Sequence, residues 1–214
     1  MSHPISPRTI LAALLALLVV ALPAVAQAKR PGHAGAVVFS KATEVKAGEF
    51  EGGLFAVRDG RLNQLTEDPA DVEPDFSADG RSLVFVRDGN VFTMRPDGSG
   101  QRQLTSGPEL DSAPKIAPNG RYVVFERRTA ADGPADLFTI RIGGGQPQAL
   151  TTGSSDDREA TFAPDGRAIA FTCSRTNSAE VVHDDICAVT PSGSRHYHLT
   201  DTAGLDEWAP RYFA

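Results

Sequence analysis

The sequence predicts an all-β fold made of repeated four-stranded units, and three observations predict it. A short phrase, in which an Asp-Gly or Asn-Gly turn precedes an apolar run, occurs at residues 76–85, 116–125 and 162–171. Asp-Gly and Asn-Gly supply the positive φ that a tight hairpin turn requires. Leu-Thr pairs recur at residues 65–66, 104–105, 150–151 and 199–200. A period of about 40 to 50 residues is typical of propeller blades, and the 20 Gly and 15 Pro favour short strands and tight turns.

Each unit contains four predicted strands, which we call A to D in chain order. Strand A precedes the Asp-Gly turn, and strand B is the apolar run that follows it. Strand C is an apolar segment of the Phe-Thr-Met type, expected at residues 54–57, 91–94, 137–140 and 186–189. Strand D ends in Leu-Thr. Strand B of the second unit, residues 83–86, is apolar on both faces, as expected for an inner strand covered by neighbouring blades.

The two ends of the repeat region complement each other. The first unit begins at strand B, residues 36–39, with no strand A before it. Residues 207–213 match a strand A with no strand B after it. We therefore expect residues 29–214 to form one domain, a propeller of four blades of four antiparallel strands, closed by the C-terminal strand joining the first blade. Such closure removes the open sheet edges that invite aggregation.

The first 28 residues have the features of a secretory signal peptide. Arg8 precedes the apolar stretch 10–22, and Ala26-Gln27-Ala28 fits the small-residue cleavage rule before Lys29. The alternative is an uncleaved membrane anchor, for which the apolar stretch is short. The cleavage model predicts a periplasmic or extracellular protein with no stable membrane insertion.

An oxidising compartment would allow the two cysteines, Cys173 and Cys187, to form a disulfide. Aligned with the second unit, Cys187 is expected to face Phe171 across the strand pair, with Cys173 diagonal to it on the same face. Two free thiols are the alternative.

Charge and motifs limit the classes of function. The net charge of −6 argues against a nucleic-acid partner, because phosphate binding needs a basic surface. No catalytic motif of a serine hydrolase or zinc protease and no phosphate-binding loop occurs. His196 and His198 alternate on one strand, near His183 in sequence, and are expected either as solvated side chains or as metal ligands. The sequence predicts no catalytic or metal residues.

One acidic residue recurs at the same place before each strand A: Asp71, Asp111, Asp157 and Glu207. Because strand A lines the axis of a propeller, these four carboxylates are expected to ring the mouth of the central channel. The longer connections between strands B and C, expected at residues 40–52, 129–135 and 175–184, lie at the same end. Either each acid caps its own turn, or the ring holds a cation or a partner's Lys, Arg or amino terminus.

The repeated phrase resembles a known family. Asp-x-x-Pro-x-Phe-Ser-x-Asp-Gly-Arg-x-(Val/Ile)-x-Phe, followed by Gln-Leu-Thr, is similar to the propeller repeat of TolB-like periplasmic proteins, which also occurs in propellers attached to prolyl-oligopeptidase-type peptidases. The resemblance covers nearly all of residues 35–213, although four units are fewer than the six usual in that family. It implies an exported binding module.

Together these observations predict a secreted or periplasmic, non-catalytic propeller that binds a protein or peptide through its loop end and acidic channel mouth. We expect a monomer or a homodimer, with no cofactor other than a divalent cation that the acids could hold. The alternative is a polysaccharide lyase or hydrolase that uses the channel-mouth acids with a divalent metal.

Overall fold

The computed structural model describes residues 35–176, 182–201 and 206–212, which all belong to one compact unit, Pro31–Ala214. The predicted signal peptide, residues 1–28, lies outside the described residues. Within the part described there is no helix long and apolar enough to cross a membrane.

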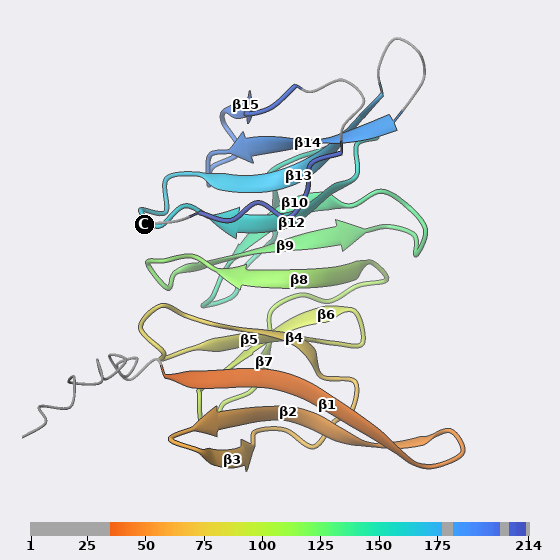
Figure 1. The fold of residues 1–214 in the computed structure, drawn as a ribbon, viewed down its shortest axis with the longest axis vertical. Coiled ribbons are helices and arrows are strands. Elements are labelled where there is room, and N and C mark those ends of the chain that lie inside the picture. Colours follow the sequence, from red (N-terminus) through yellow and green to blue (C-terminus); the bar gives the residue numbers. More distant parts are fainter. Residues whose placement is uncertain (1–34, 177–181, 202–205, 213–214) are drawn as a thin grey trace, which may run out of the picture. The chain divides into compact units, whose positions relative to one another are not determined.

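Four antiparallel sheets follow one another along the chain, and we call each a blade (Figure 1). The first contains β1 (Ala36–Lys46), β2 (Glu49–Arg58) and β3 (Arg61–Gln64). The second contains β4 (Val72–Phe76), β5 (Leu83–Arg87), β6 (Asn90–Met94) and β7 (Arg102–Gln103). The third contains β8 (Leu110–Ile116), β9 (Tyr122–Arg128), β10 (Asp136–Arg141) and β11 (Gln148–Ala149). The fourth contains β12 (Asp157–Phe162), β13 (Ile169–Thr176), β14 (Val182–Val189) and β15 (His196–His198). The all-β repeat fold is therefore confirmed.

The core is divided into clusters that lie between successive blades. Leu54 of the first blade packs with Leu83, Phe85 and Met94 of the second. The second and third blades share a cluster containing Val84, Val91, Leu104, Ile116, Val123, Phe125 and Ile140. The third and fourth share Val124, Leu137, Leu150, Ala160, Ile169, Phe171, Cys173, Cys187 and Val189. Strand β5 is buried on both faces, as its apolar run predicts.

The Leu-Thr signature has a structural role that is the same in every blade. The threonine hydroxyl accepts a hydrogen bond from a backbone N–H of strand C, at the residue where the sequence predicts that strand to start. The donor and acceptor pairs are Leu54 and Thr66 (2.9 Å), Val91 and Thr105 (2.8 Å), Leu137 and Thr151 (2.9 Å), and Ile186 and Thr200 (2.8 Å). Leu104 and Leu150 enter the core between blades, whereas Leu199 of the last blade is exposed. The signature thus joins the end of strand D to the start of strand C.

Strands β4, β8 and β12 each carry a bulge at the same position, with a positive φ at a residue other than glycine, and Ala209 of the C-terminal segment shares this positive φ. The φ values are 53° at Glu73, 49° at Ala113, 57° at Glu159 and 54° at Ala209. Pairing with strand B shifts register around the first three of these residues. Positive φ is uncommon outside glycine and persists only where surrounding contacts hold it.

A glutamate of the preceding blade supplies such a contact at three of these residues. The Ala113 N–H donates to Oε2 of Glu73 at 2.6 Å, and the Glu159 N–H donates to Oε1 of Glu126 at 2.7 Å. The Ala209 N–H donates to Oε2 of Glu159 at 2.7 Å. From the second blade on, successive blades are therefore joined by a contact between a glutamate carboxylate and a backbone N–H of the segment that follows.

The described C-terminal residues, 206–212, form no strand and are not seen paired with β1, but they repeat two features of a strand A: the positive φ at Ala209 and a backbone hydrogen bond from Glu207. The N–H of Glu207 donates to the carbonyl of Asp184 at 2.8 Å, as the N–H of Asp111 does to Gly89 at 2.8 Å. The strand pairs of the described residues leave the first sheet with three strands. Closure of the ring by the C-terminal strand is therefore not confirmed and stays a prediction.

One predicted loop is wrong. Residues 40–52 form most of a long hairpin, because β1 runs to Lys46 and β2 begins at Glu49. The described residues of the 175–184 connection all lie in β13 and β14, and only the 129–135 connection lies between strands as expected.

Candidate functional site

The predicted acidic positions occupy equivalent places at one end of the blades. Asp71, Asp111 and Asp157 are buried, with exposed fractions of 1%, 3% and 5%. The backbone N–H of Asp157 donates to the carbonyl of Ala135 at 2.8 Å, which ties the start of β12 to the preceding blade. Each acid thus lies where one blade passes to the next.

Arginines of the same blade neutralise the acids of the second and third blades. Nε and Nη2 of Arg87 donate to the two oxygens of Asp71 at 2.6 and 2.7 Å. Arg127 donates to Asp111 in the same way, at 2.7 and 2.8 Å. These hydrogen bonds raise the pKa of both arginines. Asp71 and Asp111 therefore hold their own blades together rather than capping turns.

The same guanidinium groups lie over aromatic rings. The Arg87 guanidinium carbon is 5.4 and 5.2 Å from the ring centroids of Phe85 and Phe92. For Arg127 the distances are 5.3 Å to Phe125 and 4.9 Å to Phe138. Cation–π attraction adds to the ion pair, so each arginine is held by a buried carboxylate and two stacked rings.

These arginines are not among the predicted site residues, although the sequence holds a signal for them. Arg87 and Arg127 each come two residues after the phenylalanine of strand B, and Lys41 takes this place after Phe39 in the first blade. The Nζ atom of Lys41 lies 5.9 Å from the Phe55 ring. A cation thus recurs at this position in the first three blades.

The fourth blade departs from this pattern. Cys173 pairs with Asp185 across β13 and β14, which is the place that Arg127 has opposite Asp136. Cys187 faces Phe171, as the sequence predicts, and takes the place of the second ring. The two cysteines form a disulfide, with their Cα atoms 5.8 Å apart, so the predicted bond is confirmed.

Asp157 is consequently a buried acid whose blade has Cys173, and not an arginine, at the position of Arg87 and Arg127. Among the described residues it forms no ion pair with a lysine or arginine, unlike Asp71 and Asp111. Burial raises the pKa of Asp157 to about 6. A hydrogen bond from Thr151 and the charge of His196 oppose the rise, whereas the carboxylates of Asp136 and Asp156 add to it.

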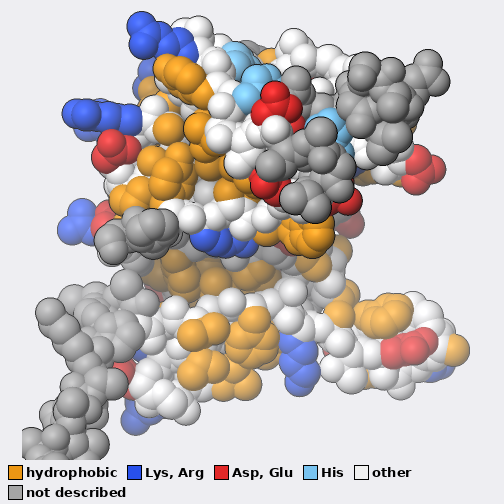
Figure 2. All heavy atoms as spheres, turned by 45° about the horizontal axis from the view of Figure 1, so that its top comes forward, with side chains coloured by type: hydrophobic (Ala, Val, Ile, Leu, Met, Phe, Trp, Pro, Cys, Tyr) orange, Lys and Arg blue, Asp and Glu red, His pale blue; other side chains and the backbone are white. Residues whose placement is uncertain are grey.

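A pocket of about 290 Å³ opens beside this acid. Its lining includes Asp157, Phe171, the disulfide, Thr151, His196 and His198. Figure 2 shows histidine side chains near hydrophobic and acidic ones where the fourth blade faces the viewer. We call this cavity the fourth-blade pocket. The histidines of β15 are exposed, as the simpler prediction for them had it.

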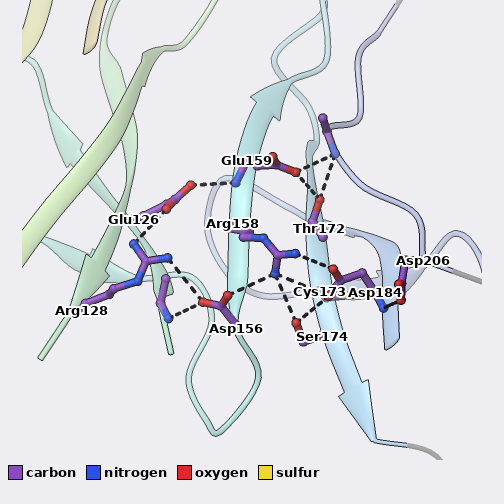
Figure 3. A network of polar contacts seen from close by, with 12 residues as sticks. Glu126, Arg128, Asp156, Arg158, Glu159, Thr172, Cys173, Ser174, Asp184 and Asp206 are labelled. Atoms are coloured by element: carbon purple, nitrogen blue, oxygen red, sulfur yellow. Dashed lines mark hydrogen bonds and ion pairs between the residues drawn. The ribbon is translucent and has the colours of Figure 1, made fainter. Parts of the chain in front are cut away.

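A second polar network crosses from the third blade to the fourth (Figure 3). Arg128 pairs with Glu126 at 3.3 Å and with Asp156 at 3.5 Å. Arg158 pairs with Asp156 at 3.1 Å and with Asp184. Burial raises the pKa of Glu126. Two cations shared among three carboxylates fix the ends of β9, β12 and β14 relative to one another.

Metal-ligating atoms come together at one further place. Side-chain ligand atoms of His183, Asp185 and Asp201 lie within 4.8 Å of one another, and such a set could hold a divalent ion. Cys173, Cys187 and His198 are equally close, but the sulfurs are bonded to each other and are not thiolate ligands.

The structure leaves the four-acid ring untested as a joint binding site. It places Asp71 and Asp111 in internal ion pairs and Asp157 at a pocket, and it seats the Glu207 backbone on β14.

Comparison with known proteins agrees with the fold. No protein-family model matches the chain. A TolB homolog of Chlorobium luteolum is 28% identical over 75 residues, which is 34% of this chain and 17% of that protein. Putative TolB from Agrobacterium tumefaciens superposes with a TM-score of 0.59 at 18% identity, covering 76% of this chain and 61% of that one. TolB from Acinetobacter baumannii gives 0.56 at 20% identity, covering 79% and 42%.

The chain is a β-propeller protein, and its fold is that of the TolB-like β-propellers. It spans less than two thirds of the length of each of these relatives.

Proposed function

We propose that this chain is an exported, non-catalytic TolB-like propeller that binds a protein or peptide partner. The partner contacts the end of the blades at which Asp71, Asp111, Asp157 and Glu207 lie. In this proposal Asp71 and Asp111 stabilise the blades through their arginines, and Asp157 faces the partner. The proposed compartment is the periplasm or the extracellular space.

One observation carries the proposal: a carboxylate that is internally neutralised in two blades opens into a pocket in the fourth. Binding residues are commonly carried on a rigid scaffold. The hydrogen bonds from backbone N–H groups to glutamates of the preceding blade provide such a scaffold here. The TolB names of similar proteins support the class of function.

Affinity capture tests the proposal. The purified protein is immobilised and exposed to the exported fraction of its source cells, and retained proteins are quantified by mass spectrometry. The comparison is with Asp157→Asn combined with Glu207→Gln, which neutralises two of the four acids. We expect a partner retained by the unchanged protein to fall at least fivefold with this variant.

The matched control neutralises acids at the other end of the blades. Asp79→Asn with Asp165→Asn alters the A–B turns of the second and fourth blades. The third blade already has asparagine at the equivalent position, Asn119, so the turn accepts this residue. This control should retain the partner fully. Equal retention by all three proteins, or no partner retained by the unchanged protein, contradicts the proposed function.

A further inference from the structure

We propose that the fourth-blade pocket receives the guanidinium group of an arginine side chain from the partner. This inference rests on the proposed function and specifies which group of the partner is recognised. Its basis is a comparison of the blades with one another, because the second and third blades show how this scaffold holds a guanidinium group.

The internal sites provide the template. In the third blade the Arg127 guanidinium makes two hydrogen bonds to Asp111, at 2.7 and 2.8 Å, and lies over the Phe125 and Phe138 rings. In the second blade Arg87 also approaches Gln101 Oε1, at 3.2 Å. A buried carboxylate and an aromatic wall therefore surround the cation in both blades, and a polar residue of strand D joins them in the second.

The fourth blade retains these components and has Cys173 at the position of the arginine. Asp157 is the carboxylate, and the Phe171 ring is the wall, both buried. His196 lies opposite Val189 at the strand D position that corresponds to Gln101. The shorter Cys173 leaves a cavity of about 290 Å³, far larger than the ~30 Å³ that one water molecule occupies in the liquid.

Charge selects a cation as the guest. The groups that act on Asp157 are the carboxylates of Asp136 and Asp156, the Thr151 hydroxyl and the His196 ring. Two of these are anionic and none is a permanent cation. A buried carboxylate in such surroundings is stabilised by an incoming positive charge.

Geometry selects guanidinium over ammonium. A guanidinium group offers a planar fork of donors that matches both oxygens of a carboxylate, and its flat face stacks on an aromatic ring. Phe171 and the Cys173–Cys187 disulfide give the pocket an apolar wall next to the carboxylate. A lysine ammonium can neutralise the charge of Asp157. It has no planar pair of donors for the two carboxylate oxygens and no flat face to stack on the Phe171 ring.

Titration with small probes tests the inference without knowledge of the partner. Nα-acetyl-L-arginine N-methylamide is added to the purified exported protein, and binding is followed by NMR shifts of pocket residues. The citrulline analogue has the same shape without the charge, and the lysine analogue has the charge without the plane. We expect the arginine probe to bind at least tenfold more tightly than either analogue.

A double substitution provides the sharpest variant. Cys173→Arg with Cys187→Phe rebuilds in the fourth blade the arrangement of the third, so an internal guanidinium fills the pocket. The variant should remain folded and should lose probe binding at least tenfold. If it does not fold, Asp157→Asn serves instead, since it removes the charge with little change of shape. Asp165→Asn, at the opposite end, should bind as the unchanged protein does.

The outcomes separate this inference from the proposed function. Equal binding of the arginine and citrulline probes, or unchanged binding by the filled-pocket variant, overturns the inference. Tight binding of Zn²⁺ that displaces the arginine probe through His196 and His198 overturns it as well. If a partner is captured yet the probe fails, only the guanidinium assignment is wrong. If the probe binds and no partner is captured, the proposed function fails.

Discussion

At the scale of single residues, the repeated acid shows that one side chain can have opposite effects in equivalent places. Asp111 is satisfied by two charge-assisted hydrogen bonds from Arg127. Asp157 is equally buried and has no such partner among the described residues. The carboxylate at this position therefore stabilises the third blade and destabilises the fourth.

The same substitution should accordingly change stability in opposite directions. Asp111→Asn leaves the Arg127 charge without its carboxylate and is expected to lower the free energy of unfolding by about 3 kcal/mol. Asp157→Asn removes a buried charge and is expected to raise it by about 2 kcal/mol at pH 7.5. Urea unfolding of both variants measures the difference, and two changes of the same sign would contradict this account.

The effect of Asp157 should also depend on pH. Its folded-state pKa of about 6 lies above the value of ~3.9 for an unfolded chain, so the folded state holds the proton more tightly. Stability from this group is present below pH ~4 and is lost as pH rises through 6. The benefit of Asp157→Asn should therefore shrink to well under ~1 kcal/mol near pH 4. Unfolding curves at several pH values test this, and a constant benefit would exclude the assignment.

At the scale of elements, the contact between strands D and C depends on one threonine in each blade. The hydroxyl of Thr105 accepts the Val91 N–H at 2.8 Å, and both residues are buried. Thr105→Val keeps the shape but leaves this donor unpaired, which should cost about 1–2 kcal/mol of unfolding free energy. Thr43→Val, on the exposed hairpin, should change stability by less than ~0.5 kcal/mol. Equal effects in thermal unfolding would show that the hydroxyl contact is unimportant.

Elements whose burial follows the repeat were predictable from the sequence. The position of Cys187 opposite Phe171 followed from aligning the fourth unit with the second, and the structure confirms it. The hairpin of β1 and β2 was missed because residues 40–50 are exposed on both faces. A strand without a buried face has no alternation of apolar and polar residues to reveal it.

The candidate site was less predictable than the fold. The four acids were found by spacing, but the arginines that bind two of them lie sixteen residues away in sequence on the neighbouring strand. Their contact depends on strand register and on burial. The pocket follows from a replacement at Cys173, which becomes visible only when Arg87 and Arg127 have been seen in place.

At the scale of the whole molecule, the repeat makes a specific prediction about ring closure. Lys41 occupies in the first blade the position of Arg127, and Glu207 occupies the position of Asp111. If the C-terminal strand joins the first blade, these two residues face each other as Arg127 and Asp111 do. Directly opposed residues of an antiparallel pair have Cα atoms within disulfide range, at about 4.5–5.5 Å.

Engineered cysteines test closure. Lys41→Cys with Glu207→Cys should form an intramolecular disulfide in a monomer, detected by peptide mass mapping. Lys46→Cys with Glu207→Cys is the control, because Lys46 lies five residues further along β1, about 17 Å away. A disulfide between two copies would mean that the strand is exchanged between molecules. If no disulfide forms at all, the prediction of a closed ring is wrong.

The glutamate contacts between successive blades bear on how propellers of this kind can differ in their number of blades. In the third blade the bulge residue is Ala113, which has no carboxylate. Glu126 on the paired strand β9 accepts the Glu159 N–H instead, so the acceptor is kept although the residue that supplies it differs. Glu159 receives Ala209 just as Glu73 receives Ala113. The second, third and fourth blades thus each present a glutamate acceptor to the backbone N–H of the segment that follows. Duplicating or deleting one of these blades leaves a glutamate acceptor for the backbone N–H of the next blade. Propellers of this kind can therefore gain or lose blades without a change in this contact.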